Sequence, residues 1–182
     1  MTEKEPLVRI RNLNIIGITD ETEVPIINGV DLDLHRGEVI GLIGESGAGK
    51  STLGLAAMGF TRDGCHIRGG EVTFDGIDLV DAGPEIRREL LGKRIAYVAQ
   101  SAAASFNPAH RIIRQHSEAP MVHSVMPRQQ SEEDAIDLYN RLRLPNPEEI
   151  GFRYPHQVSG GQLQRAMTAM AMSCRPDLII FD

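Results

Sequence analysis

The stretch that decides the fold of this chain reads GESGAGKST, and its residues are Gly44, Glu45, Ser46, Gly47, Ala48, Gly49, Lys50, Ser51 and Thr52. It satisfies the pattern GxxxxGK[ST]. An almost wholly apolar run, EVIGLI at residues 38–43, precedes the stretch, and residues 51–59 after it have a helical pattern. A strand before the loop and a helix after it are the context in which this pattern forms a phosphate-binding loop. A glycine-rich turn that matches by chance is the alternative, and this context argues against it.

The residue types of this loop indicate its chemistry. Its glycines let successive backbone N–H groups point inward around phosphate oxygens, and the following helix adds a partial positive charge at its N-terminus. Lys50 can reach the β- and γ-phosphates of a nucleotide, and the Ser51 hydroxyl can coordinate Mg²⁺. We therefore expect residues 44–52 to bind the phosphates of a nucleotide together with Mg²⁺.

A second motif is the run Leu178-Ile179-Ile180-Phe181-Asp182, four apolar residues followed by an acid. A buried strand that ends in a carboxylate can direct that group at the metal beside a phosphate-binding loop. Many core strands end in Asp, so the run is informative only because the glycine-rich loop precedes it in the same chain.

A third motif is Val158-Ser159-Gly160-Gly161-Gln162, which precedes a helical pattern over residues 161–174. One face of that predicted helix is apolar, with Leu163, Met167, Met170 and Cys174 at helical spacing. Ser159 and the backbone N–H groups of Gly160 and Gly161 would lie at the helix N-terminus, where they could grip a γ-phosphate. An ordinary serine N-cap with a glycine turn is the alternative. The position between the loop and the acidic strand favours an anion site.

Together these motifs resemble those of ABC ATPases, whose signature is usually written LSGGQ and here has Val158 in the place of Leu. The resemblance covers essentially the whole chain and is greatest to the ATP-binding subunits of oligopeptide and dipeptide importers. Nickel, glutathione and some sugar importers are similar at the same places. The stretches that carry the resemblance to this branch are GESGAGKST at 44–52, SFNP at 105–108, YPH at 154–156 and CRP at 174–176.

The resemblance implies an α/β fold: the P-loop core of an ABC ATPase with a β-rich N-terminal subdomain and an inserted helical subdomain. Residues 1–100 would form the β-rich part and the core, residues 101–157 the helical subdomain, and residues 158–182 the signature helix and the acidic (Walker B) strand. The C-terminal part of the core would be missing. Within the helical subdomain, Ser131-Glu132-Glu133-Asp134 resembles a capping box that would start a helix.

The resemblance also assigns roles. Gln100, after a predicted strand at residues 94–99, matches the position whose side chain contacts the metal or the attacking water and links the core to the helical subdomain. Gln100 and Asp182 would be the catalytic residues, and Ser51, Gln100 and Asp182 would hold Mg²⁺. Two such domains would dimerise head to tail, so that Ser159, Gly160, Gly161 and Gln162 would serve the partner's ATP.

Transmembrane permease subunits would be the other partners, and they would hold the protein at the cytoplasmic face of the membrane. The acidic balance, a formal net charge of −6 and a pI near 5.5, argues against nucleic acid as a partner. The two cysteines, Cys65 and Cys174, fit reduced thiols. His110, His116 and His123 are expected to be solvated or structural.

The sequence departs from the family in two respects. Residues 1–43 contain no Phe, Tyr or Trp to stack on adenine. The counterpart position falls near Ile16 and Gly17, so we expect weaker ATP binding unless Ile16 or Ile18 supplies an aliphatic contact.

The family's water-activating glutamate and switch histidine, which follow the acidic strand, have no counterpart up to Asp182. We therefore expect an N-terminal fragment of an importer ATPase that binds ATP but hardly hydrolyses it. The alternative is a non-hydrolysing nucleotide-binding module or a degenerate gene product. A soluble ABC ATPase of DNA repair or translation is disfavoured by the importer-like stretches and the acidic charge.

Overall fold

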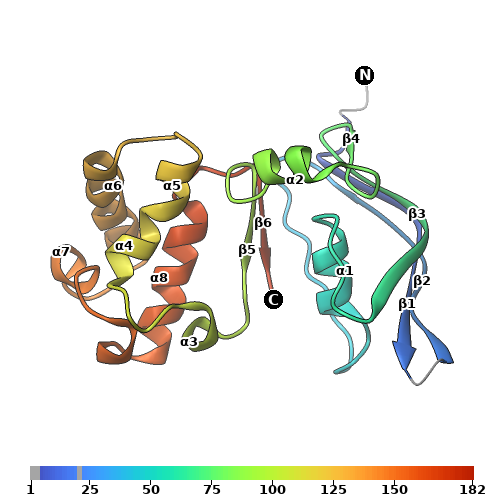
Figure 1. The fold of residues 1–182 in the computed structure, drawn as a ribbon, viewed down its shortest axis with the longest axis horizontal. Coiled ribbons are helices and arrows are strands. Elements are labelled where there is room, and N and C mark those ends of the chain that lie inside the picture. Colours follow the sequence, from blue (N-terminus) through green and yellow to red (C-terminus); the bar gives the residue numbers. More distant parts are fainter. Residues whose placement is uncertain (1–4, 20–21) are drawn as a thin grey trace. The chain divides into compact units, whose positions relative to one another are not determined.

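The computed structural model describes residues 5–19 and 22–182 (Figure 1). The chain divides between Arg87 and Arg88 into two compact units. The first unit carries the glycine-rich loop. The second carries Gln100, the signature stretch and Asp182.

The first unit contains a sheet of four antiparallel strands in the order β2-β1-β3-β4. The strands are β1 (Val8–Thr19), β2 (Thr22–Leu34), β3 (Cys65–Phe74) and β4 (Ile77–Asp78), with helix α1 (Lys50–Ala56) beside them. Alternate residues of β1 are fully buried, because successive side chains of a strand point to opposite faces of its sheet. The buried apolar side chains of this sheet are Val8, Ile10, Leu13, Ile15, Ile27, Val72 and Phe74.

The expected strand at residues 38–43 is not formed. Among the described residues this segment pairs with no strand, and Val39 and Ile43 are 94% and 98% exposed. A strand requires a neighbour whose backbone N–H and C=O groups it can bond, and an apolar composition does not supply that neighbour. Near the start of the chain, β1 continues to Thr19, and Gly17 pairs with both Val24 and Cys65.

Gly70 marks the closest packing in this sheet. Its φ is 96°, and a Cβ at this position would lie 2.6 Å from the carbonyl oxygen of Arg11 and from the Cα of Leu13. The neighbouring strand bulges at the same place, where the register of β1 shifts between Arg11 and Asn14. Only glycine fits, because the obstacles are backbone atoms of the adjacent strand.

Gly70→Ala is therefore expected to destabilise the first unit by about 3 kcal/mol or more, since overpacking and a positive φ each cost about 1–3 kcal/mol. Gly76→Ala is the matched control. Gly76 also has a positive φ, 80°, in the Asp75-Gly76 turn, but a Cβ there would meet nothing within 4 Å. It should cost only about 1 kcal/mol. Urea unfolding compares the two variants, and equal losses would contradict the packing argument.

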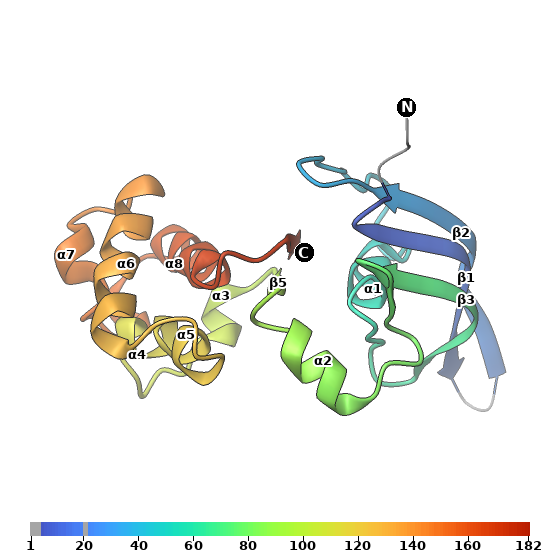
Figure 2. The same ribbon diagram turned by 90° about the horizontal axis from the view of Figure 1, so that it is seen from above.

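The second unit combines two short parallel strands with a group of helices (Figure 2). Strands β5 (Ile95–Val98) and β6 (Leu178–Phe181) pair in parallel, with Val98 opposite Phe181. This confirms the two strands expected there. The preceding helix α2 (Pro84–Leu90) lies across the boundary between the units.

The helices of the second unit pack around one apolar core. They are α3 (Ala102–Ser105), α4 (Ile112–His116), α5 (Glu118–Val122), α6 (Arg128–Arg141), α7 (Pro147–Ile150), a 3₁₀ turn (Pro155–Gln157) and α8 (Gly160–Met172). Leu163 and Met167 of α8 meet Ala135, Leu138 and Tyr139 of α6 in this core. The apolar face that we expected for the helix after Gly161 is therefore the face of α8 that packs against α6 in this core.

The expected capping box at Ser131 is wrong. Helix α6 begins one turn earlier, at Arg128, and Ser131 lies inside it with its N–H bonded to the carbonyl oxygen of Pro127 at 3.0 Å. The rigid φ of Pro127 suits the residue at which a helix starts, so the proline sets the boundary. Ser131 is 1% exposed, whereas a capping serine normally lies at a helix end.

His116 is a structural residue within these helices. It is 1% exposed and packs edge-on against the ring of Tyr139, 5.3 Å between ring centroids. Burial lowers the pKa of His116 from 6.5 to about 4, and the charge of nearby Arg175 adds to this, although Asp134 opposes it. The imidazole is therefore neutral near pH 7.

A pH dependence follows from the lowered pKa of His116. Between pH 6.5 and about 4 the unfolded chain holds the proton that the folded chain excludes, so stability is complete above pH 6.5 and decreases as the pH falls through this window. The shift corresponds to about 3 kcal/mol. His116→Phe should remove this component from the free energy of unfolding measured by circular dichroism. His156→Phe, at an exposed site, is the control, and identical pH profiles for His116→Phe and the unmutated protein would exclude the effect.

Candidate functional site

The glycine-rich loop is held open by its backbone conformation. Gly44, Gly47 and Gly49 all have positive φ, at 159°, 85° and 84°, and the Ala48 N–H bonds to the carbonyl oxygen of Glu45. Lys50 Nζ donates to the carbonyl oxygens of Gly44 and Glu45 at 2.8 and 2.6 Å. The ammonium group therefore lies across the concave side of the loop, where it can meet an anion together with backbone N–H groups.

Gly49 is needed for packing as well as for its φ. A Cβ at Gly49 would lie 2.8 Å from Ile27 Cδ1 and 3.1 Å from the carbonyl oxygen of Ile26. At Gly47 a Cβ would meet nothing within 4 Å. The loop is thus pressed against strand β2 at Gly49 and exposed at Gly47, which leaves room on the side where a ligand would enter.

Ile26 packs between Gly17 of the sheet and the glycine-rich loop. Ile26 lies over Gly17, since a Cβ at Gly17 would be 3.0 Å from Ile26 Cδ1. The same Ile26 adjoins Gly49 of the loop. The aliphatic contact with adenine that we expect from Ile16 or Ile18 stays a prediction. The contact of Ile26 with the loop could not be predicted from sequence, because the pairing of β1 with β2 brings Ile26 there.

Gln100 and Asp182 leave the same edge of the two-stranded sheet. Both follow the carboxyl ends of parallel neighbours, β5 and β6, and the Asp182 N–H bonds to the carbonyl oxygen of Val98 at 3.0 Å. The Asp182 carboxylate accepts a hydrogen bond from the Tyr97 hydroxyl at 2.7 Å. Carboxyl ends of parallel strands are a usual place for ligand-binding side chains in α/β proteins.

Gln164 holds the segment that carries Gln100. Its side chain donates to the carbonyl oxygen of Ala99 at 3.2 Å and accepts from the Ala102 N–H at 3.3 Å, so it bonds on both sides of the exposed Gln100. Gln164 lies one turn into α8. No sequence signal indicates this role, because more than 60 positions separate the partners.

The signature stretch caps α8 in a reciprocal manner. Ser159 Oγ accepts from the Gln162 N–H at 3.3 Å, and the Ser159 N–H donates to Gln162 Oε1 at 2.9 Å. The ordinary N-cap considered from the sequence is therefore present. Gly160 and Gly161 need a further explanation, because neither has a positive φ and a Cβ at either would meet nothing within 4 Å. The chain itself does not require glycine there, although glycine weakens a helix.

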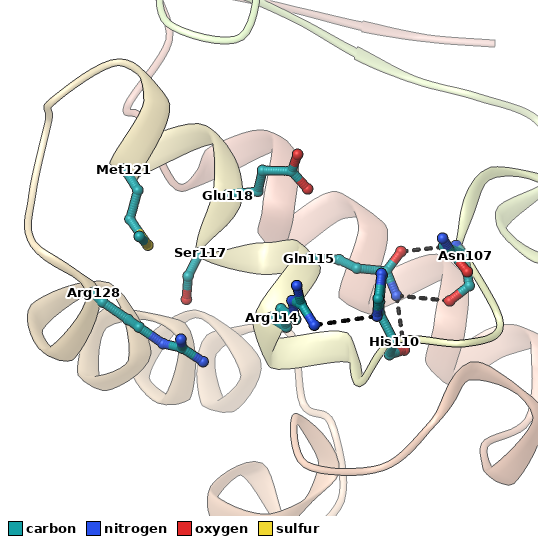
Figure 3. A pocket seen from close by; sticks show the side chains of 8 residues that line it. All are labelled: Asn107, His110, Arg114, Gln115, Ser117, Glu118, Met121 and Arg128. Atoms are coloured by element: carbon teal, nitrogen blue, oxygen red, sulfur yellow. Dashed lines mark hydrogen bonds between the residues drawn. The ribbon is translucent and has the colours of Figure 1, made fainter.

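A cavity of about 500 Å³ opens on the helical part of the second unit (Figure 3). Gln115 fixes the turn at its edge, since its side chain bonds to the Asn107 N–H and to the carbonyl oxygens of Asn107 and His110. The lining residues are Asn107, His110, Arg114, Gln115, Ser117, Glu118, Met121 and Arg128. This groove carries the guanidinium groups of Arg114 and Arg128, the second of which pairs with Glu132 at 2.8 Å, and the carboxylate of Glu118.

Among residues 5–19 and 22–182, no helix has both the length and the apolar character that crossing a membrane requires.

The fold and the loop are those of the ABC ATPase family. The sequence pattern of the family described as ABC transporter matches residues 27–182, and the chain belongs to that family. In structure it is similar to a chain of the ATP-binding cassette MJ0796, solved as a dimer in a post-hydrolysis state bound to ADP and Pi, with a TM-score of 0.84 and 22% identity over 96% of this chain and 73% of that one. At that identity the likeness shows the fold.

Curated relatives place the chain near one branch of the family. It is 36% identical over 177 residues to a probable peptide ABC transporter ATP-binding protein, y4tR of Sinorhizobium fredii, and 32% identical over 180 residues to the oligopeptide transport ATP-binding protein OppD of Escherichia coli. The alignments cover 97% and 99% of this chain and 53% of each relative. The chain thus spans about half the length of these relatives.

Proposed function

We propose that this chain is the ATP-binding part of the ATPase subunit of an ABC importer that moves peptides or similar small solutes across a membrane. The loop at residues 44–49 carries the proposal, since three glycines of positive φ and the Lys50 ammonium face the same concave space. The names of the relatives y4tR and OppD support peptides as the cargo.

The donor set suits ATP with Mg²⁺. Ser51 offers a hydroxyl, Gln100 an amide oxygen and Asp182 a carboxylate, and Mg²⁺ prefers oxygen ligands. Bound Mg²⁺ would neutralise charge on the β- and γ-phosphates. Lys50 would bind the same phosphates, and residues 44–49 would orient them through their backbone N–H groups.

The signature stretch supports the proposed head-to-tail dimer. The open glycines Gly160 and Gly161 leave room for a close approach of phosphate, and the Ser159 hydroxyl stands at the start of the thirteen-residue helix α8. In such a dimer Ser159, Gly160, Gly161 and Gln162 would contact the ATP of the partner subunit. Each ATP would then join two chains.

The groove beside Arg114 and Arg128 is the proposed contact with the permease subunits. These would hold the protein at the cytoplasmic face of the membrane. Gln115 ties the edge of the groove to residues 107–110, which lie a short distance along the chain from Gln100. The helical part would in this way report the state of the ATP site to the transport subunits.

For a polypeptide of residues 1–182 we propose Mg-ATP binding with little hydrolysis, because none of its residues matches the family's water-activating glutamate or switch histidine. The test is titration with a fluorescent ATP analogue in the presence of Mg²⁺, followed by measurement of phosphate release. We expect saturable binding of the analogue that added ATP reverses, and slow release of phosphate. A chain that does not bind the analogue would refute the proposed function, and rapid turnover would refute the low-activity part alone.

A further inference from the structure

Tyr97 lies beside the carboxylate of Asp182, and the pairing of the two strands explains why. In the parallel register Tyr97 is opposite Ile180. Since side chains alternate between the faces of a strand, Tyr97, Ile180 and Asp182 share one face. The other face carries Val98 and Ile179, which pack with the helical core. The tyrosine and the aspartate are thus diagonal neighbours on the face away from that core.

A hydrogen bond to the neighbouring strand holds the backbone of Asp182, independently of its side chain. Its N–H donates to the carbonyl oxygen of Val98 at 3.0 Å, which extends the ladder between β5 and β6 by one residue. Val98 is 1% exposed and Ala96 7%, so β5 is anchored in the core on either side of Tyr97. With the main chain held, the direction of the carboxylate depends on its side-chain torsions.

The Tyr97 hydroxyl restrains those torsions. It donates to Asp182 Oδ2 at 2.7 Å, a length typical of a hydroxyl bonded to a charged carboxylate. A phenol is a neutral donor, so the bond orients the carboxylate without cancelling its negative charge. An arginine or lysine at residue 97 would instead form an ion pair and compete with a cation.

We infer that Tyr97 is a positioning residue for the metal: it holds the Asp182 carboxylate in the orientation in which that group binds Mg²⁺ or a water molecule of its shell. This inference rests on the proposed role of Asp182 in Mg-ATP binding. Partners that orient a metal ligand through a hydrogen bond typically contribute 10–100-fold to metal affinity. Tyr97→Phe removes the hydroxyl and keeps the ring, so its effect should fall in this range.

The test uses Mn²⁺ as the probe, with ATP present, and measures free Mn²⁺ by electron paramagnetic resonance for the full chain and three variants. Asp182→Asn should lose most of the Mn²⁺ affinity, and Tyr97→Phe should weaken it about tenfold or more. Tyr154→Phe, which removes the hydroxyl of another partly buried tyrosine in the same unit, should match the unmutated chain. In EDTA, which removes the metal, the unmutated chain and the three variants should bind ATP with equal affinity, because the substitutions are expected to affect metal binding alone.

The outcomes separate the two proposals. If Asp182→Asn weakens Mn²⁺ binding and Tyr97→Phe does not, the positioning role of Tyr97 is wrong and the proposed function stands. If neither substitution matters while ATP binds, Asp182 is not a metal ligand and the inference falls with it. If Tyr97→Phe also weakens ATP binding in EDTA, the residue acts on the fold and not on the metal. If the unmutated chain binds no ATP, both proposals are refuted.

Discussion

Lys50→Ala is expected to lower the affinity for Mg-ATP by about 100-fold or more. Hydrogen bonds to a charged group contribute about 1.5–3 kcal/mol each, so the loss of a bond to each of two phosphates costs about 3 kcal/mol at the least. The ammonium group lies 2.8 Å from the Gly44 carbonyl oxygen and 2.6 Å from that of Glu45, so it belongs to the loop itself. Titration with a fluorescent ATP analogue measures the change.

Lys93→Ala is the matched control, because it removes an exposed lysine from the second unit. Its affinity for ATP should equal that of the unmutated chain. Unchanged affinity in Lys50→Ala would remove residues 44–52 as the nucleotide site, and the proposed function would then have no structural basis. Circular dichroism of both variants shows whether the fold is retained.

Ser159→Arg is expected to abolish ATP-dependent dimerisation while the monomer still binds ATP. The long cationic side chain would fill the space that Gly160 and Gly161 leave open at the start of α8. The glycine-rich loop of the same chain lies in the other unit, so the affinity of the monomer for ATP should be kept. Size-exclusion chromatography with Mg²⁺ and a non-hydrolysable ATP analogue measures the dimer.

Ser159→Ala separates the loss of the cap from the blocked surface. It removes the Ser159 Oγ bond to the Gln162 N–H and should cost about 1 kcal/mol of stability, but it adds no bulk. A dimer that persists in Ser159→Arg would refute the signature assignment. Equal losses of dimer in both variants would show that loss of the Ser159 hydroxyl, and not the bulk of the arginine, explains the effect.

The glycine-rich loop could be located from sequence because its pattern is local. Its glycines and the neighbouring lysine lie within nine residues, and in the structure Gly44, Gly47 and Gly49 have positive φ. The apolar face of α8 was predictable for the same reason. Helical spacing alone aligns Leu163 with Met167, and both are buried.

The pairing of strands that are far apart in the chain could not be predicted from the residue types. EVIGLI at 38–43 has the composition of a buried strand, yet among the described residues it has no strand partner. The capping box predicted at Ser131 failed in a different way. Several residues near that point could have begun a helix, and Pro127 was the stronger local signal.

The sequence by itself determined the class of this protein, because the phosphate-binding loop, the signature stretch and the acidic strand are short and their chemistry depends on residue type. Only the tertiary structure decided which side chains support them. Strand pairing brought Ile26 over Gly17 and Tyr97 to Asp182, and helix packing placed Gln164 beside Gln100. These contacts join residues far apart in the chain, and hydrogen bonding and close packing between distant segments exist only once the backbone has folded.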